Sequence, residues 1–150
     1  MSQNRKTIFI THGFRFHVPW KKLNLLIETR LSKSYLNVST PWHDPSFVPY
    51  DEWGKSMIEE TLRSQSSNVD LMIIIESLTT KKSMEKYINL EILNALNTSK
   101  NMEIYIYADI TNGEGIKEVL KKKLNLNDDK RISNSLIFSD PINLVAAINL

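Results

Sequence analysis

The sequence predicts an α/β fold in which a parallel sheet lies between two layers of helices. Short apolar or β-branched runs alternate five times with segments whose apolar residues recur at helical spacing. The run at residues 69–75 is apolar throughout apart from one aspartate, as in strands that are covered on both faces. Because strands that alternate with helices pair in parallel, this pattern favours a three-layer sandwich.

The expected strands are short and rich in isoleucine, valine, threonine and aromatic residues, which suit a pleated, buried surface. They are residues 7–11, 35–39, 69–75, 102–108 and 135–138.

The helices of the first half follow from periodicity and from proline. Residues 20–31 carry apolar side chains at helical spacing, with Pro19 near the start. Three prolines in the loop at 40–49 exclude both a helix and a central strand there. Asp51 is suited to cap the next helix, whose apolar stripe includes Met57, Ile58 and Leu62.

The second half repeats the alternation. The longest apolar run, 69–75, is expected to be the central strand, and a helix is expected at 83–96. Two glycines break the chain at 112–115 before a helix at 116–124. Asp140 and the proline after it open a last helix that runs to Leu150.

For five such strands, the flavodoxin-like order 2-1-3-4-5 is the expected arrangement. The length of 150 residues and the lack of a repeat or linker predict a single domain over 1–150.

Composition narrows the function classes. The chain is 41% hydrophobic and 24% charged, as in ordinary globular proteins. A net charge of +2 is too small to indicate nucleic-acid binding but suits a small anionic ligand. There are no cysteines, which favours a reducing compartment, and there is neither a signal peptide nor a long apolar run. We therefore expect a cytoplasmic protein that binds neither membrane nor nucleic acid.

Several activities common on this architecture lack their sequence motifs. The chain has no Gly-rich phosphate loop followed by Lys and Ser or Thr, no dinucleotide fingerprint and no Gly-x-Ser-x-Gly elbow. A phospho-accepting receiver domain is excluded because Thr11 and His12 stand where it needs acidic residues after the first strand. The histidines His12, His17 and His43 are too scattered to predict a metal site.

Polar residues remain at successive strand exits, where ligands bind in open parallel sheets. His12 and Gly13 follow the first strand, Asn37 and Ser39 end the second, and Ser77 ends the third. Glu91 lies on the helix beyond, with an aromatic residue, Tyr87, one turn earlier on the same helix face. Each residue also has an ordinary structural role, as a cap, a turn residue or a surface glutamate. Their convergence predicts a site in the crevice between the first and third strands.

The chain resembles the TIR domain family at these positions. Phe9-Ile10-Thr11-His12 is similar to the family's first strand. The segments at 37–45, Asn-Val-Ser-Thr-Pro-Trp-His-Asp-Pro, and at 87–92, Tyr-Ile-Asn-Leu-Glu-Ile, resemble those of a bacterial TIR-like branch that includes the TIR subunit of Thoeris antiphage defence systems. The resemblance extends over about residues 6–109.

The resemblance implies that NAD is the substrate and that Glu91 matches the family's catalytic glutamate. Such enzymes cleave the nicotinamide–ribose bond with no further cofactor and no metal. Some release ADP-ribose, and others make a cyclic or conjugated ADP-ribose signal that activates a companion effector protein. Activation then commonly requires assembly into a homo-oligomer.

The remaining expected substrate contacts follow from the same chemistry. Nicotinamide leaves NAD as a neutral molecule, so a single carboxylate that stabilises the oxocarbenium-like ribose is sufficient. Phe14, Trp42 or Tyr87 would then supply an aromatic wall, Asp44 lies in the adjoining loop, and the pyrophosphate would meet backbone amides or the lysines at 81 and 82.

Two alternatives stay open. A non-catalytic TIR adaptor would bind other TIR domains through exposed helix faces and would not depend on Glu91. A nucleotide sensor would bind NAD-derived signals without turnover.

Overall fold

The structure is a computed structural model that describes residues 6–12, 18–31, 33–38, 55–79, 85–111, 113, 115–126 and 128–148, without the side chains of 55–57. In this part of the chain five strands form one parallel sheet in the order β2-β1-β3-β4-β5. The strands are β1 (Lys6–Ile10), β2 (Tyr35–Asn37), β3 (Leu71–Ile75), β4 (Glu103–Tyr107) and β5 (Leu136–Phe138). The predicted α/β class and strand order are confirmed.

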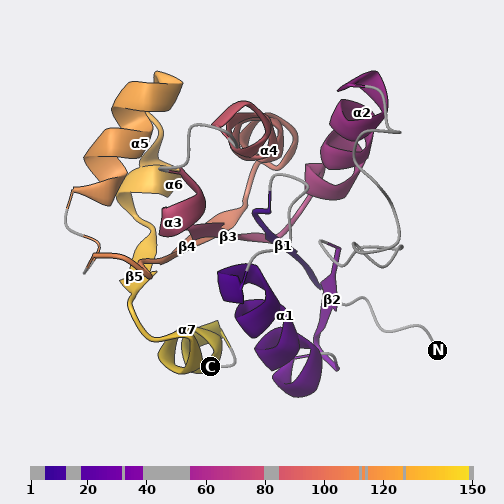
Figure 1. The fold of residues 1–150 in the computed structure, drawn as a ribbon, viewed down its shortest axis with the longest axis vertical. Helices are drawn as coiled ribbons and strands as arrows, with labels where there is room; N and C mark the ends of the chain where they lie inside the picture. The colour runs from indigo at the N-terminus through magenta and orange to yellow at the C-terminus, as the bar shows by residue number, and fades with distance from the viewer. Residues whose placement is uncertain are drawn as a thin grey trace.

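Helices cover both faces of the sheet, as Figure 1 shows. On one side lie α1 (Val18–Arg30) and α7 (Pro141–Ile148). On the other side lie α2 (Lys55–Ser66), α4 (Glu85–Thr98) and α5 (Ile116–Leu124), with the short helices α3 (Glu76–Thr79) and α6 (Lys130–Ser133). The fold is therefore a flavodoxin-like three-layer sandwich.

The central strands are buried on both faces, which is why the sequence there lacks alternation. All five residues of β3 are buried, and Ile8, Phe9 and Ile10 of β1 have no exposed surface. Successive side chains of a strand point to opposite faces, so complete burial of a run requires helices on both sides. Among the described residues no helix is both long enough and apolar enough to cross a membrane.

Several boundaries differ by one or two residues from the sequence-based prediction, among them those of β1, β2, β4, α1 and α4, and two differences near the third strand have a clear physical cause. The third strand begins at Leu71 rather than at residue 69, because Asn68 adopts a left-handed conformation (φ 54°) and the Asp70 carboxylate accepts a hydrogen bond from the backbone of Thr7 at 2.8 Å. The prediction that Ser77 ends that strand is wrong, because Ser77 lies in the helix α3. The Thr79 hydroxyl donates to the Glu76 carbonyl at 2.7 Å, which stabilises this single turn.

The helix α4 is attached to its neighbours at several points. Asn94 donates to the Arg63 carbonyl and to the Ser66 hydroxyl of α2, each at 2.9 Å. Two residues further along the helix, the guanidinium of Arg131 donates to the Leu96 carbonyl at 3.0 Å. That guanidinium satisfies a carbonyl that the helix end leaves without a partner. These contacts fix the helix that carries Glu91.

Candidate functional site

The site is built at the carboxyl ends of β1 and β3, which are adjacent strands although they are not consecutive in the chain. Thr11 joins them just beyond β1: its N–H donates to the Ile73 carbonyl at 3.0 Å and its hydroxyl accepts from the Ile75 N–H at 3.1 Å. The chain reverses its direction of winding between these strands. In parallel α/β sheets this switch point is where ligands bind.

Glu91 is the most deeply buried acidic group at this edge, with 0% of its surface exposed. It lies on the apolar stripe of α4 between Ile88 and Ala95. Its carboxylate reaches back to the first strand, where both oxygens accept from the backbone N–H of His12, at 3.0 and 3.3 Å. Charged hydrogen bonds of this kind are stronger than neutral ones, so the carboxylate holds the end of β1 against α4.

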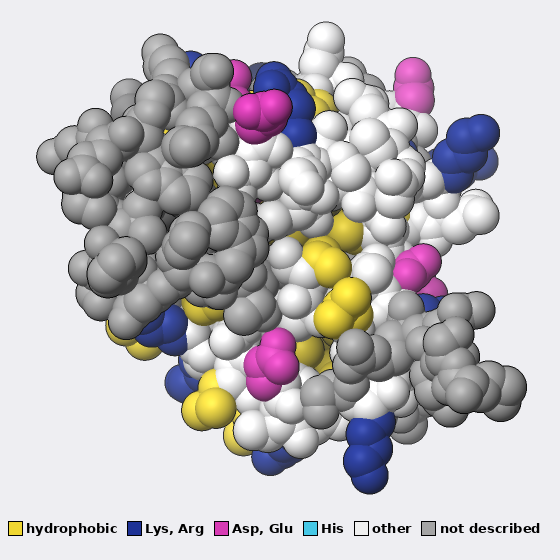
Figure 2. All heavy atoms as spheres, turned by 90° about the vertical axis from the view of Figure 1, so that its right-hand side faces the viewer, with side chains coloured by type: hydrophobic (Ala, Val, Ile, Leu, Met, Phe, Trp, Pro, Cys, Tyr) yellow, Lys and Arg dark blue, Asp and Glu magenta, His cyan; other side chains and the backbone are white. Residues whose placement is uncertain are grey.

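The ring of His12 is enclosed as completely as Glu91. It has no exposed surface, and the Phe9 and Trp20 rings lie 5.5 and 6.1 Å away between centroids. Its Nε2 is 3.0 Å from Oε1 of Gln65, which comes from α2, and its Nδ1 is 3.5 Å from a Glu91 oxygen. Figure 2, which views the α1–α2 side of the molecule, shows no described histidine at the surface.

Burial decides the charge of this ring. Desolvation lowers the pKa of His12 from 6.5 to about 3, although the hydrogen bond to Gln65 acts in the opposite direction. His12 is therefore neutral at neutral pH, and its contact with Glu91 is not an ion pair. A neutral imidazole carries one N–H, so the tautomer determines whether the ring directs its N–H toward Gln65 or toward Glu91.

A second buried glutamate lies at the same edge. Glu76, which follows β3 directly and is 4% exposed, accepts from the N–H groups of Ile110 and Thr111 at 3.2 and 2.9 Å and from the Thr111 hydroxyl at 2.6 Å. These donors all belong to the segment after β4. Glu76 thus joins the ends of β3 and β4, just as Glu91 joins β1 and α4.

The structure brings some of the predicted site residues together. His12 and Glu91 are in direct contact. Tyr87 is half-buried one turn before Glu91 on α4, and the Lys86 ammonium lies 5.9 Å from the centroid of its ring.

Two other predicted residues engage different neighbours. The Ser77 N–H donates to the Asp109 carboxylate at 2.9 Å, on the β4 side of α3. β2 ends at Asn37, before the predicted strand end at residue 39, and the Asn37 amide donates to Asn24 of α1 at 2.6 Å. The other predicted contacts lie outside the described residues: Gly13, Phe14, Ser39, Trp42 and Asp44, together with the lysines at 81 and 82.

Sequence reasoning missed Gln65 and Glu76. Gln65 is 8% exposed and continues the stripe of Ile58 and Leu62, so a polar residue at an apolar helical position was the available signal. For Glu76 the only signal in the sequence was its position directly after the longest apolar run. Among the described residues no three His, Asp or Glu side chains gather as metal ligands would.

Within the described residues, the arrangement places the Glu91 carboxylate, with no exposed surface, at the switch point of the sheet. Comparisons with known proteins return no matching family model, no matching curated protein and no matching solved structure.

Proposed function

We propose that this chain is a TIR-like NAD glycohydrolase or ADP-ribosyl cyclase, with Glu91 as its catalytic carboxylate. It would act in the cytoplasm of a bacterium during antiphage defence, in the manner of the TIR subunit of Thoeris systems. Its ADP-ribose-derived product, cyclic or conjugated, would activate a companion effector. The enzyme would require NAD as substrate, no metal and no other cofactor.

The observation that carries the proposal is the contact between Glu91 and the end of β1. The carboxylate is held by the His12 N–H at 3.0 Å, at the switch point between β1 and β3. Ligands of parallel sheets bind at this point of the fold, so a buried carboxylate there supports a catalytic role. The tyrosine one turn earlier keeps an aromatic side chain beside the site.

The chemistry requires few groups. The bond between the ribose C1′ and the nicotinamide nitrogen breaks, and the electron pair stays with nicotinamide, which becomes neutral. Positive charge develops on the ribose, and a fixed carboxylate in a dry site stabilises it strongly. A nucleophile then attacks C1′ and loses its proton; water gives ADP-ribose, and another group gives a cyclic or conjugated product.

Burial supports a regulated enzyme. Glu91 has no exposed surface, so a ribose could contact it only after the surrounding side chains separate. We propose that the described arrangement is a resting form. Self-assembly or a phage-derived trigger would open it, which agrees with the requirement for assembly that the TIR resemblance implies.

The experiment measures small molecules by mass spectrometry after purified protein is incubated with NAD, alone and in lysate of phage-infected cells that express it. Glu91→Gln is compared with Glu76→Gln, since both replace a buried carboxylate at the same sheet edge. We expect nicotinamide release by the wild type and by Glu76→Gln, and a loss of about a thousandfold in Glu91→Gln. The mass of the second product separates hydrolysis from cyclisation and conjugation.

A non-catalytic module is the second candidate, and the complete burial of Glu91 favours it. In that function Glu91 only fastens α4 to β1, and the exposed helix faces bind other TIR domains. Absence of nicotinamide release under both conditions would support this candidate. Release that persists in Glu91→Gln would contradict the assignment of Glu91.

A further inference from the structure

The two nitrogens of the His12 ring face different helices. Nε2 lies 3.0 Å from Oε1 of Gln65 on α2, and Nδ1 lies 3.5 Å from Oε2 of Glu91 on α4. All three side chains are buried, Gln65 with 8% of its surface exposed and the other two with none. The rings of Phe9 and Trp20 pack beside the imidazole and keep it in this orientation.

The two distances decide which ring nitrogen carries the proton. An amide oxygen can only accept a hydrogen bond, so Nε2 must be the donor toward Gln65. A separation of 3.0 Å is normal for such a bond, whereas the 3.5 Å between Nδ1 and Glu91 is longer than a good one. Because a neutral imidazole has one N–H, the proton lies on Nε2, and Nδ1 keeps its lone pair on the side of Glu91.

We propose that Gln65 is a positioning residue and that His12 is the proton acceptor of the reaction. Gln65 holds the ring as the tautomer with its proton on Nε2. The unprotonated Nδ1 then accepts the proton that the nucleophile loses when it attacks the ribose C1′. This inference rests on the proposed function, because it assigns a further step of the same reaction.

The step balances with the groups that are present. After nicotinamide has left with its electron pair, the oxygen of the nucleophile bonds to C1′, its O–H bond breaks, and the proton moves to Nδ1. The ring becomes a cation, which the Gln65 oxygen and the Glu91 carboxylate both stabilise. The proton passes to water when the product leaves. A base that is oriented by a third group through its other nitrogen is a recurrent catalytic arrangement.

One opening of the site would control both groups. Nδ1 lies 3.5 Å from Glu91, so side chains that separate to admit the ribose also expose the ring nitrogen. In the described form burial lowers the pKa of His12 to about 3, so the ring accepts no proton near neutral pH. Substrate and water that enter the site reduce this desolvation, and the ring becomes a useful base only in the open form.

The first test locates the proton on His12 in the absence of NAD. NMR spectra of protein with isotope-labelled histidine distinguish a protonated from an unprotonated ring nitrogen by chemical shift, and His12→Gln identifies the His12 signals among those of the 3 histidines. We expect the proton on Nε2 in the wild type and in Gln65→Glu, which retains an acceptor. In Gln65→Met it should move to Nδ1, because the thioether accepts weakly and the Glu91 carboxylate remains.

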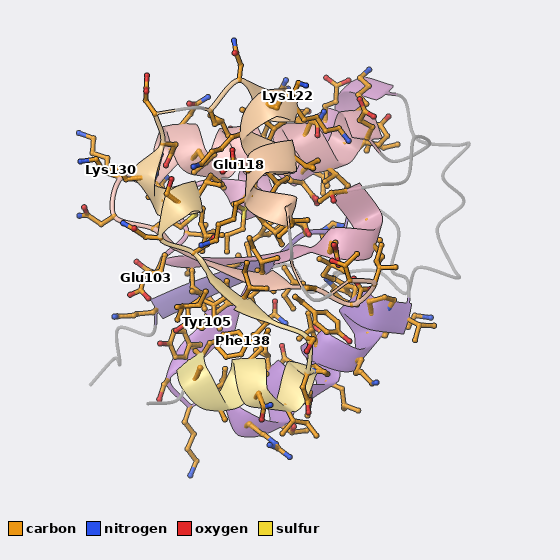
Figure 3. All side chains as sticks on the ribbon, turned by 90° about the vertical axis from the view of Figure 1, so that its left-hand side faces the viewer. Glu103, Tyr105, Glu118, Lys122, Lys130 and Phe138 are labelled. Atoms are coloured by element: carbon orange, nitrogen blue, oxygen red, sulfur yellow. The ribbon has the colours of Figure 1, made fainter. Side chains whose placement is uncertain are left out.

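Two control variants match these substitutions. Asn94→Leu removes a different amide between α4 and α2, one that donates to the Arg63 carbonyl at 2.9 Å. Lys122→Gln lowers the net charge by the same amount as Gln65→Glu, at an exposed position; Figure 3 shows Lys122 on α5. Both controls should keep the proton of His12 on Nε2.

The second test measures how the ribosyl cation is captured. The wild type and the variants are incubated with NAD and isotope-labelled nicotinamide, and mass spectrometry follows labelled NAD and the ADP-ribose-derived product. Loss of the base slows attack by the nucleophile, so a larger share of the cation recombines with nicotinamide. Gln65→Met should raise the ratio of labelled NAD to product by about tenfold or more, while Gln65→Glu and the two controls keep the wild-type ratio.

The proposal is overturned if wild-type His12 carries its proton on Nδ1, if Gln65→Met leaves the proton on Nε2, or if that variant moves the proton without changing the product ratio. Absence of nicotinamide release by the wild type would contradict the proposed function, and with it the role of His12 as a base. The nitrogen shifts would still decide whether Gln65 positions the ring.

Discussion

Two buried glutamates at one edge of the sheet have different partners. Glu76 accepts from the backbone N–H groups and the hydroxyl of the segment after β4, so its partners are successive residues of one loop. Glu91 accepts from the N–H of His12, whose ring is itself held by Gln65 from a different helix. The contacts of Glu76 are local to two neighbouring strand ends, while those of Glu91 connect β1, α2 and α4.

The difference indicates which glutamate can take part in chemistry. The Glu76 carboxylate accepts three hydrogen bonds and thereby joins two strand ends. If it moved away, the donor groups would lose their acceptor inside the protein. Glu91 is carried by the helix α4 and accepts from the end of β1, so a shift of that helix as a unit would separate the two. We therefore assign stability to Glu76 and propose activity for Glu91.

The largest expected effect is on stability at Glu76. Glu76→Ala leaves the N–H groups of Ile110 and Thr111 and one hydroxyl without their acceptor, so the free energy of unfolding should fall by about 3 kcal/mol. Denaturant unfolding of wild type and variant measures the change. A loss below about 1 kcal/mol would show that water replaces the carboxylate and would remove the contrast with Glu91.

Shortening Glu91 should affect activity instead. Glu91→Asp keeps the charge but withdraws the carboxylate from the His12 N–H by one methylene, and a misplacement of about 1 Å can cost about a hundredfold in rate. Nicotinamide release measures the effect under whichever condition gives activity in the wild type. Glu76→Asp is the control and should retain activity. Equal losses in both variants would indicate a shared structural effect.

Acid should weaken the Glu91 region through His12. The unfolded chain protonates this ring below pH 6.5, while the folded chain resists protonation until about pH 3. The unfolded state therefore binds more protons in this window, and the free energy of unfolding should fall by about 1.4 kcal/mol for each pH unit on acidification. His12→Gln should remove this part of the slope. A slope that is the same in variant and wild type would mean that the ring titrates normally when folded.

The smallest expected effect is on stability, at a lysine that links α3, the helix of Glu76, to α4, the helix of Glu91. The Lys123 ammonium donates to the Thr79 carbonyl of α3 at 2.7 Å and lies 3.3 Å from the Glu85 carboxylate at the start of α4. Lys123→Met should lower the free energy of unfolding by about 0.5 kcal/mol, because the group is partly exposed and screened by solvent. Lys122→Met, on the exposed side of the same helix, should change nothing measurable in thermal unfolding.

The sequence predicted the fold well because each prediction rested on a pattern that burial enforces. The continuous apolar run of β3 and the alternation of strands with helices define a parallel sheet, and the expected order is the observed one. The short helices α3 and α6 were missed, since four residues are too few to show helical periodicity. Their stability comes from side-chain contacts such as the Asp129 carboxylate, which accepts from the Arg131 N–H.

The candidate site was predicted only where it depends on sheet topology. His12 and Glu91 were expected at the same sheet edge, and they are in contact. Gln65 was not foreseen, because its contact with His12 depends on how α2 packs against α4, and no local pattern encodes that packing. Glu76 was not foreseen because its partners follow a different strand, 34 and 35 residues further along the chain.

The hydrogen bond between the His12 N–H and Glu91 joins residues that are 79 positions apart. Because that amide hydrogen is buried, it can exchange with deuterium only when α4 moves away from β1 or when the whole chain unfolds. Its protection factor relative to the slowest amides of β3 therefore measures how often the carboxylate separates from the strand. One amide signal thus reports the frequency of the opening that the proposed catalysis requires, without any substrate.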